Sequence, residues 1–410
     1  MVIKTRSEGS ANGAVPGDLR RHNRGLLLDL LSRQGAMSRK DIAAQTRLTA
    51  AAISRITREL VDAGFVTEGA GGEEQAGRNG HGARGRPSIA LRLAPGGGFV
   101  VGVGIGAYEQ WVQVANLRGA CVSRRALRLL GARTPAKAIA ELAAQVRSLA
   151  DEARIPRGRL LGVGVAIAGV VDPARAVVLH SPNIGWDGVA LGESLARATR
   201  LPVVVEAMHH ALNLAEARHG AMRGIADAVL VNAAMGIGAS VMEEGRIVRG
   251  SHGAAGQIGH MRVARAPELC TCGRRGCLDT VASGYAVLRR LGAVAARRTA
   301  GEHRTDYAQR LLAATERERA GERAAKAAFR ACGEQLGEAL NAVRAVFDPA
   351  RIVLAGPLSQ TGSYVEGVRA RLGAEPQVFL ATHTTDAAAA NLALVQLAFG
   401  PRLDLSRLRD

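Results

Sequence analysis

Three cysteines and one histidine are spaced as a metal-binding group beyond the middle of the chain. Cys270, Cys272 and Cys277 lie in the segment Cys-Thr-Cys-Gly-Arg-Arg-Gly-Cys, and His260 precedes the first of them by ten residues. One imidazole and three thiolates complete a tetrahedral zinc site, and the glycines between Cys272 and Cys277 permit the sharp turns that it requires. Four protein ligands leave no position for water, so we expect structural zinc. The alternatives are a redox-sensing set of thiols or inert buried cysteines.

A second group of residues, near the N-terminus, has the pattern of a helix-turn-helix that reads DNA. Ser38 and Thr49 each precede a helical segment as an N-cap, and a short turn at residues 47 and 48 separates the two helices. One face of the second helix is apolar. The opposite face carries small residues followed by arginines, which suits close approach to the major groove and contacts to guanine or phosphate. The apolar face holds Ile53, Ile56 and Leu60, and the opposite face holds Ala51, Ser54, Arg55 and Arg58.

The sequence after this helix predicts a wing. Residues 64–67 and 88–93 have the composition of two strands, and the Gly-rich segment 69–87 joins them as an extended loop. Arg84 and Arg86 flank a glycine at the end of this loop, where arginines can enter a narrow minor groove. We therefore expect DNA contacts from Ser38, Thr49, Ala51, Ser54, Arg55, Arg58, Arg84 and Arg86. The alternative is a small three-helix bundle that does not bind DNA.

The composition of the chain changes near residue 95. From residue 99 onward, runs of Val, Ile and Gly alternate with helical segments rich in Ala, Leu and Arg, as in an α/β fold. The Gly-rich apolar segments 100–106 and 229–238 are similar, which indicates a duplication and two lobes with a cleft between them. We predict a disordered tail at 1–17, a winged helix-turn-helix at 18–95 and a two-lobed domain at 96–410.

The chain is strongly basic, with 54 Lys and Arg against 36 Asp and Glu and a formal net charge of +18. Such a charge attracts nucleic acid, although arginine is spread along the chain and compositional bias explains part of it. We find no apolar leader and no run of about 18 apolar residues, so we expect a cytoplasmic protein that does not contact the membrane. In a reducing compartment, Cys121 and Cys332 are expected to be small buried residues.

These motifs together resemble the ROK family of repressors and sugar kinases, and the match extends over nearly the whole chain. The supporting segments are the winged helix, Gly-His-Met at 259–261, Cys-x-Cys-Gly-x-x-Gly-Cys-Leu at 270–278, Ser-Pro-Asn-Ile-Gly-Trp at 181–186 and Asp-Pro-Ala-Arg-Ile-Val-Leu-Ala-Gly at 348–356. The resemblance implies an α/β chain in which the winged helix-turn-helix precedes an actin-like, hexokinase-type two-lobed ATPase fold with a structural zinc loop.

The sequence departs from the kinases of this family at three positions. Gly104 stands where the family carries an acidic residue that helps to hold the metal nucleotide, and Met235 replaces the threonine of the second phosphate loop. Met208 stands where the family has the aspartate that accepts a proton from the sugar hydroxyl, and a thioether cannot accept that proton. We therefore expect a protein that is not an enzyme. The alternative is an active sugar kinase fused to a DNA-binding module.

The resemblance also implies contacts to an effector, which we expect to be a sugar or a sugar phosphate. Carried over by position, these contacts are Asn183, Gln257, His260 and Asp279, although Gln257 and Asp279 each replace a glutamate that is usual in the family. His209 and His210 either replace the missing acceptors or are ordinary helix residues.

The expected function is regulation of transcription, by default repression of carbohydrate-related genes. A two-fold DNA operator would be bound by a homodimer or homotetramer, and an effector in the cleft would weaken DNA binding by linkage. In a further alternative, the large domain only forms oligomers and docks a protein partner.

Overall fold

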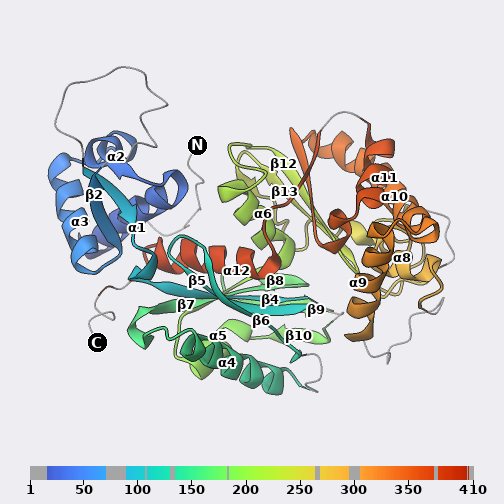
Figure 1. The fold of residues 1–410 in the computed structure, drawn as a ribbon, viewed down its shortest axis with the longest axis horizontal. Helices are drawn as coiled ribbons and strands as arrows, with labels where there is room; N and C mark the ends of the chain where they lie inside the picture. Colours follow the sequence, from blue (N-terminus) through green and yellow to red (C-terminus); the bar gives the residue numbers. More distant parts are fainter. Residues whose placement is uncertain are drawn as a thin grey trace.

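The computed structural model describes residues 16–70, 89–106, 109–129, 134–181, 184–263, 268–294, 305–373, 377–403 and 405. A small N-terminal domain lies beside two α/β lobes (Figure 1). Among the helices in these ranges, none combines the length and the apolar character needed to cross a membrane.

The N-terminal domain is a winged helix, in which three helices pack with a small sheet. The sheet has the order β1-β3-β2, and both pairings are antiparallel. The predicted wing strands are therefore present as β2 and β3, whereas Arg84 and Arg86 of the predicted wing loop lie outside the described residues. The elements are α1 (Pro16–Gln34), β1 (Met37–Ser38), α2 (Arg39–Thr46), α3 (Ala50–Asp62), β2 (Val66–Ala70) and β3 (Ile89–Leu93).

Local sequence sets the limits of the helix-turn-helix. The Ser38 hydroxyl accepts a hydrogen bond from the Asp41 amide at the start of α2, and the Thr49 hydroxyl accepts one from the Ala52 amide at the start of α3. Arg47, with a left-handed φ of 58°, ends α2 between them. The apolar face of α3 is buried as its spacing predicts, through Ile53, Ile56 and Leu60.

The first lobe follows a short 3₁₀ turn, η2 (Pro95–Gly97), which lies at the predicted domain boundary. Its sheet has the order β11-β7-β4-β5-β6, and a small sheet of order β10-β9-β8 lies beside it. Helices α4 and α5 cover one face of the large sheet (Figure 1). The elements are β4 (Phe99–Ile105), β5 (Gln110–Asn116), β6 (Cys121–Ala126), α4 (Pro135–Glu152), η4 (Arg157–Arg159), β7 (Leu160–Ile167), β8 (Val170–Asp172), β9 (Val177–Ser181), β10 (Trp186–Val189), α5 (Leu191–Thr199) and β11 (Val203–Ala207).

The second lobe contains a sheet of order β14-β13-β12-β15-β16. Alternate residues of β12 face the core under α10 and the core under α6. Its strands are β12 (Ala228–Ala233), β13 (Ile237–Glu243), β14 (Arg246–Ile247), β15 (Arg351–Ala355) and β16 (Val378–Leu380). Its helices are α6 (Met208–His219), η5 (Ile258–His260), α7 (Asp279–Ala282), α8 (Gly284–Arg290), α9 (Thr305–Arg319), α10 (Arg323–Phe347), η6 (Pro357–Gln360) and α11 (Gly362–Leu372), and the chain then returns as α12 (Thr385–Ala393) and η7 (Leu394–Ala398).

The two large sheets have the same topology, as the two similar Gly-rich segments predict. In each sheet the first strand, β4 or β12, pairs antiparallel with the strand after it and parallel with the fourth strand in chain order, β7 or β15. Helix α12 crosses from the second lobe onto the free face of the first sheet (Figure 1). Helices α6 and α12 therefore lie side by side between the lobes.

Glycines in the first sheet allow α12 to pack directly on the backbone of the strands. A Cβ atom at Gly102 would lie 2.2 Å from the Asp386 carbonyl oxygen, and one at Gly164 would lie 2.0 Å from that of Ala389. At Gly104 the nearest atoms, from Asp386 and Thr385, would lie 3.1 Å away. The Gly-rich strands are therefore required by close helix packing, independently of any phosphate-binding role.

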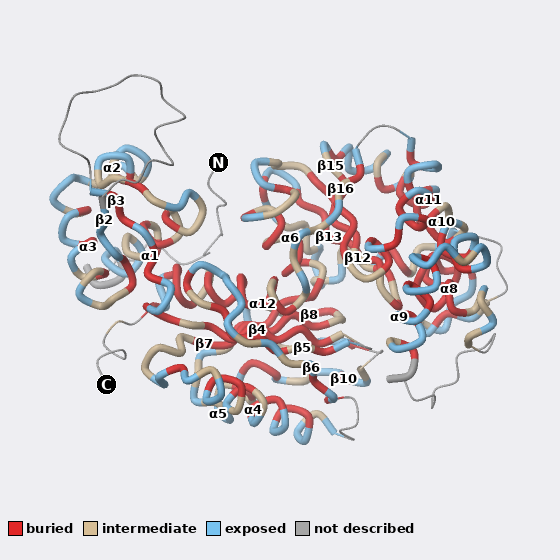
Figure 2. The backbone as a smooth tube through the Cα atoms, in the orientation of Figure 1, coloured by how far each residue is buried: buried red, intermediate tan, exposed pale blue. Residues whose placement is uncertain are grey.

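The winged helix shares an apolar core with the end of α12. Leu27, Leu28 and Leu31 of α1 belong to the same buried cluster as Leu394, Leu397 and Phe399. Figure 2 shows buried residues on both sides of this contact, in α1 and in the segment around the end of α12. A Cβ atom at Gly25 would lie 2.3 Å from the Phe399 carbonyl oxygen, so the two segments meet through their backbones.

Polar contacts reinforce this junction. Arg159 donates hydrogen bonds to the carbonyl oxygens of Ala63 (2.6 Å) and Gly97 (3.0 Å). Arg218, near the end of α6, forms an ion pair with Asp29 of α1, and only 3% of its side chain is exposed. Burial lowers the pKa of Arg218, and the nearby Asp29 carboxylate acts against this by stabilising the charged guanidinium.

Candidate functional site

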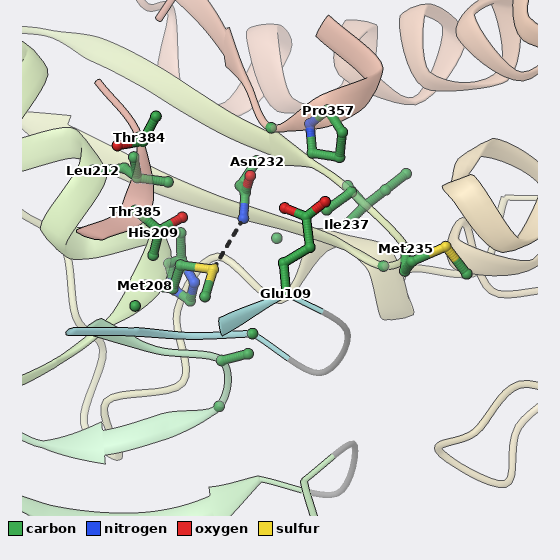
Figure 3. A pocket seen from close by; sticks show the side chains of 18 of the residues that line it. Glu109, Met208, His209, Leu212, Asn232, Met235, Ile237, Pro357, Thr384 and Thr385 are labelled. Atoms are coloured by element: carbon green, nitrogen blue, oxygen red, sulfur yellow. Dashed lines mark hydrogen bonds between the residues drawn. The ribbon is translucent and has the colours of Figure 1, made fainter. Parts of the chain in front are cut away.

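A cleft of about 1000 Å³ lies between the two lobes. Its walls come from the β4–β5 turn, the start of α6, the β12–β13 turn, the loop that carries Cys270, Cys272 and Cys277, and the start of α12. Figure 3 shows Glu109, Met208, His209, Asn232 and Thr385 among the side chains around it.

The four predicted metal ligands converge at one side of this cleft. The nitrogen and sulfur atoms of His260, Cys270, Cys272 and Cys277 all lie within 4.8 Å of one another. Cys270 Sγ lies 3.7 Å from His260 Nδ1, and Cys272 Sγ lies 3.6 Å from Cys277 Sγ. These separations match the edges of a tetrahedron of ligands around one ion, about 3.8 Å for thiolates that each lie ~2.3 Å from zinc. The cluster can therefore bind a metal ion.

In the protein alone, the Cys277 thiol disfavours ionisation. Burial, together with hydrogen bonds and charge repulsion from Cys272 and Cys270, raises the pKa of Cys277 to about 12. A bound divalent cation reverses that preference, because thiolates are the metal-binding form. Cys332 is buried as expected, but Cys121 is exposed, which corrects our expectation. It begins β6, the edge strand of the first sheet, and edge strands leave a side uncovered.

The predicted effector contacts are placed in different ways. Asp279 is buried beneath the cleft, where its Oδ1 accepts a hydrogen bond of 2.7 Å from the Ile237 amide. Gln257 is exposed at the cleft wall, and His260 both lines the cleft and belongs to the metal cluster. Asn183 lies outside the described residues.

The two positions where the chain departs most from a phosphotransfer site also lie at the cleft. Met208 is buried at the start of α6, and its sulfur accepts a hydrogen bond of 3.4 Å from the Asn232 amide (Figure 3). Met235 is buried in the apolar core of the second lobe together with Leu311. A thioether is only a weak hydrogen-bond acceptor, so neither side chain can act as a base that removes a hydroxyl proton. Burial, with a smaller effect from His210, lowers the pKa of the adjacent His209 to about 3, so this ring is neutral.

A buried ion cluster beside the cleft was not predicted from the sequence. Glu206, at the end of β11, receives hydrogen bonds from Arg249 Nη1 (2.9 Å) and Nη2 (2.7 Å), and His210 Nδ1 lies 3.3 Å from it. Only 1% of the Glu206 side chain is exposed. Burial opposes ionisation, but the hydrogen bonds and charges of His210 and Arg249 outweigh it and lower the pKa of Glu206 to about 2. The cluster joins the first sheet to the loop that carries Gln257.

We expect Glu206 to make the stability of the protein depend on acidity. Its pKa is lower in the folded protein than the ordinary 4.5, so its contribution is fully present above pH 4.5 and is lost as the pH falls toward 2. A lowering of this size corresponds to about 3 kcal/mol. Urea unfolding at pH 6 and at pH 3 measures how much stability the protein loses between these two pH values. This loss should be smaller in Glu206→Gln than in the wild type. The exposed Glu193→Gln serves as control, and an unchanged pH dependence in Glu206→Gln would contradict the assignment.

Four of the predicted DNA-binding residues lie on the exposed face of α3. Ala51, Ser54, Arg55 and Arg58 are all exposed on α3, opposite its buried face. Ser38 and Thr49 lie at the N-termini of α2 and α3, where their hydroxyls cap the helices. The exposed face of α3 is therefore small at its start and basic further along.

Comparison with known proteins agrees with this architecture. A family model described as the ROK family matches residues 100–393. The chain belongs to the ROK family. A second model, described as the MarR family, matches residues 22–68, which lie within the winged helix. The ROK match contains both lobes, the cleft and the metal cluster.

Relatives of this ROK chain include proteins named as regulators. The xylose repressor of Caldicellulosiruptor bescii is 26% identical over 271 residues, which is 66% of this chain and 66% of the repressor. The chain thus spans just under two thirds of that relative. The DNA-binding transcriptional dual regulator NagC of Escherichia coli K12 is 26% identical over 331 residues, 81% of this chain and 79% of NagC.

A solved structure shows the same ROK fold. The crystal structure of a ROK family transcriptional regulator, a homolog of the E. coli MLC protein, has a TM-score of 0.71 and 24% sequence identity. The alignment covers 95% of this chain and 99% of that one. The combination of a winged helix with an actin-like, hexokinase-type domain is therefore present in both.

Proposed function

We propose that this protein is a DNA-binding transcription regulator, a repressor of carbohydrate-related genes, whose cleft binds a sugar-like effector without transferring phosphate. The observation that carries the proposal is the connection, through α1, between the winged helix with its exposed, basic α3 and the helices that begin at the cleft. The relatives named as xylose repressor and NagC support it. A homodimer or homotetramer on a two-fold operator agrees with how such domains bind DNA.

Two helices connect the cleft with the winged helix. Helix α6 begins with the cleft residues Met208 and His209 and ends near Arg218, which pairs with Asp29. Helix α12 begins with the cleft residue Thr385 and runs into η7, on which α1 packs. An effector that favours one arrangement of the lobes therefore also favours one position of the winged helix. By linkage, DNA then weakens effector binding as much as the effector weakens DNA binding.

The cleft supports binding better than phosphoryl transfer. Met208 occupies the position of the proton acceptor, and Gly104, which packs close to the start of α12, offers no carboxylate to hold a metal nucleotide. Coupled assays with ATP, magnesium and a sugar panel test this inactivity. Turnover at ordinary enzyme rates, about 1 to 1,000 per second, would favour the kinase alternative.

Zinc is the ion that best fits the metal cluster. Three thiolates with one imidazole are typical of structural zinc sites, and four protein ligands complete its coordination. We infer that zinc holds together the loop that borders the cleft, because Thr271, Cys272 and Arg274 of this loop line the cavity.

DNA binding by α3 is tested directly with two arginine variants. Arg55→Ala and Arg58→Ala should each weaken binding to genomic sites found by mapping, by roughly tenfold or more, as a lost guanine or phosphate contact costs about 1–3 kcal/mol. If the arginine binds a phosphate, its removal also reduces the slope of log affinity against log salt concentration by about one unit. Fluorescence anisotropy at several salt concentrations measures both effects.

The matched control for this experiment is Arg197→Ala, which removes an exposed arginine from α5 of the first lobe. It should leave DNA binding unchanged. Equal affinity of all three variants and the wild type, or no protected site in genome-wide mapping, would contradict a regulator that reads DNA with α3.

A further inference from the structure

The cleft contains the carboxylate of Glu109, which belongs to none of the sequence motifs. Glu109 follows the turn between β4 and β5, lines the cavity and is exposed to it. Its side chain points away from the first lobe, into the cavity (Figure 3). Across the cavity lie Asn232 and Ile237 of the second lobe. A ligand held between the lobes can therefore contact this carboxylate.

The other two carboxylates that line the cavity are engaged by protein groups. Asp386 binds Arg124, with Oδ2 at 2.6 Å from Nε and Oδ1 at 3.1 Å from Nη2, and the Arg124 guanidinium lies 3.8 Å from the centre of the Trp111 ring. Asp279 accepts a hydrogen bond from the Ile237 amide. Within the described parts of the chain, no hydrogen bond to the Glu109 carboxylate is found, although the Gly106 amide donates one to the Glu109 backbone carbonyl. Its two oxygens are therefore available to a ligand.

The surroundings of Glu109 favour neutral ligands that donate hydrogen bonds. Partial desolvation between the lobes raises the pKa of Glu109, although the charge of Arg124 acts against this rise. A carboxylate in such a site gains by accepting hydrogen bonds from hydroxyl or amine groups. A phosphate group placed beside it is repelled, because like charges in a partly desolvated site interact strongly. Of the two arginines that line the cavity, Arg124 is already bound to Asp386, and Arg274 belongs to the loop that carries the metal cluster.

We propose that Glu109 binds hydroxyl groups of the effector and restricts the cleft to uncharged or amine-bearing polyhydroxylated ligands, excluding phosphorylated ones. This inference rests on the proposed function, because it narrows the effector from a sugar or sugar phosphate to the unphosphorylated sugar. It also supplies a strong acceptor from the first lobe at a cleft where the weakly accepting sulfur of Met208 is already bonded to Asn232. The charge of Glu109 is thus a determinant of specificity.

The test compares three proteins with paired probes. Wild type, Glu109→Gln and Glu109→Lys are titrated by calorimetry, with their metal bound, using glucose, xylose, N-acetylglucosamine, their phosphate esters and inorganic tripolyphosphate. Glu366→Lys, which changes an exposed glutamate on α11, is the charge control. For the wild type we expect binding of at least one free sugar and weaker binding of its phosphate. Glu109→Gln should weaken the sugar at least roughly tenfold, about 1.4 kcal/mol, while no longer discriminating against the phosphate.

Glu109→Lys should bind tripolyphosphate at least roughly tenfold more tightly than wild type, and Glu366→Lys should not. The proposal is overturned if the wild type prefers a sugar phosphate, if it binds no sugar in the panel, or if both lysine variants bind tripolyphosphate alike. DNA binding by the wild type is measured separately. A failure of the regulator proposal would therefore appear in that assay and not in these titrations.

Discussion

Cys277→Ser protein is expected to lose its metal ion and much of its soluble yield. Cys277 is fully buried and contributes one of four converging ligand atoms, and a serine hydroxyl is a poor ligand for zinc. The loss in metal affinity should exceed the roughly 10- to 100-fold that follows from removing a group that only orients a ligand. Metal analysis by mass spectrometry after dialysis, together with thermal unfolding, measures the two effects.

Two other cysteines provide controls for this prediction. Cys121→Ser changes an exposed thiol and should alter neither metal content nor stability. Cys332→Ser changes a buried thiol in the core under α10, so it should lower stability while the metal content stays constant. Full metal content in Cys277→Ser would show that this residue is not a ligand.

Asp29→Asn is expected to destabilise the junction between the winged helix and the lobes. It leaves the guanidinium of Arg218 buried beside the Phe399 ring, 5.6 Å from its centre, without a charged partner. Breaking one side of a buried ion pair costs about 3–5 kcal/mol. Because 22% of the Asp29 side chain is exposed, we expect the lower end of that range. Hydrogen exchange of the α1 amides, followed by mass spectrometry, should report local loss of protection.

The second variant for this junction is Arg218→Met, alone and combined with Asp29→Asn. The double variant should be more stable than Asp29→Asn alone, because no buried charge then lacks a partner. Both single variants should also reduce the coupling between sugar binding and DNA binding. Additive effects in the double variant, or unchanged exchange in α1, would contradict a coupling role for this pair.

The sequence predicted those features that depend on local pattern. The predicted metal ligands could be found because three cysteines lie within eight residues of each other, a spacing typical of metal sites. The helix-turn-helix could be found because Thr49 caps its helix locally and Ile53 and Ile56 follow a helical period. The alternation of strands and helices in the lobes likewise predicted the fold.

Features that depend on distant pairing were missed. Glu206 and Arg249 lie 43 residues apart, and Asp29 and Arg218 come from different domains, so no local pattern connects them. Glu109 follows a turn and belongs to no motif. Gly104 was interpreted only as a lost acidic residue, whereas its neighbours show that helix packing also selects glycine there. These properties become visible only when the chain is folded.

The contact between α12 and the first sheet is built almost without side chains. Gly102 and Gly164 face Ala389 and Ala390, and at the other end Gly25 faces the carbonyl group of Phe399. Such a contact leaves no room between helix and strands, and Asp386 ties the start of α12 to Arg124 of β6. A methyl group added at Gly102 or Gly164 would therefore push α12 away from the sheet and shift the helix end on which the winged helix rests.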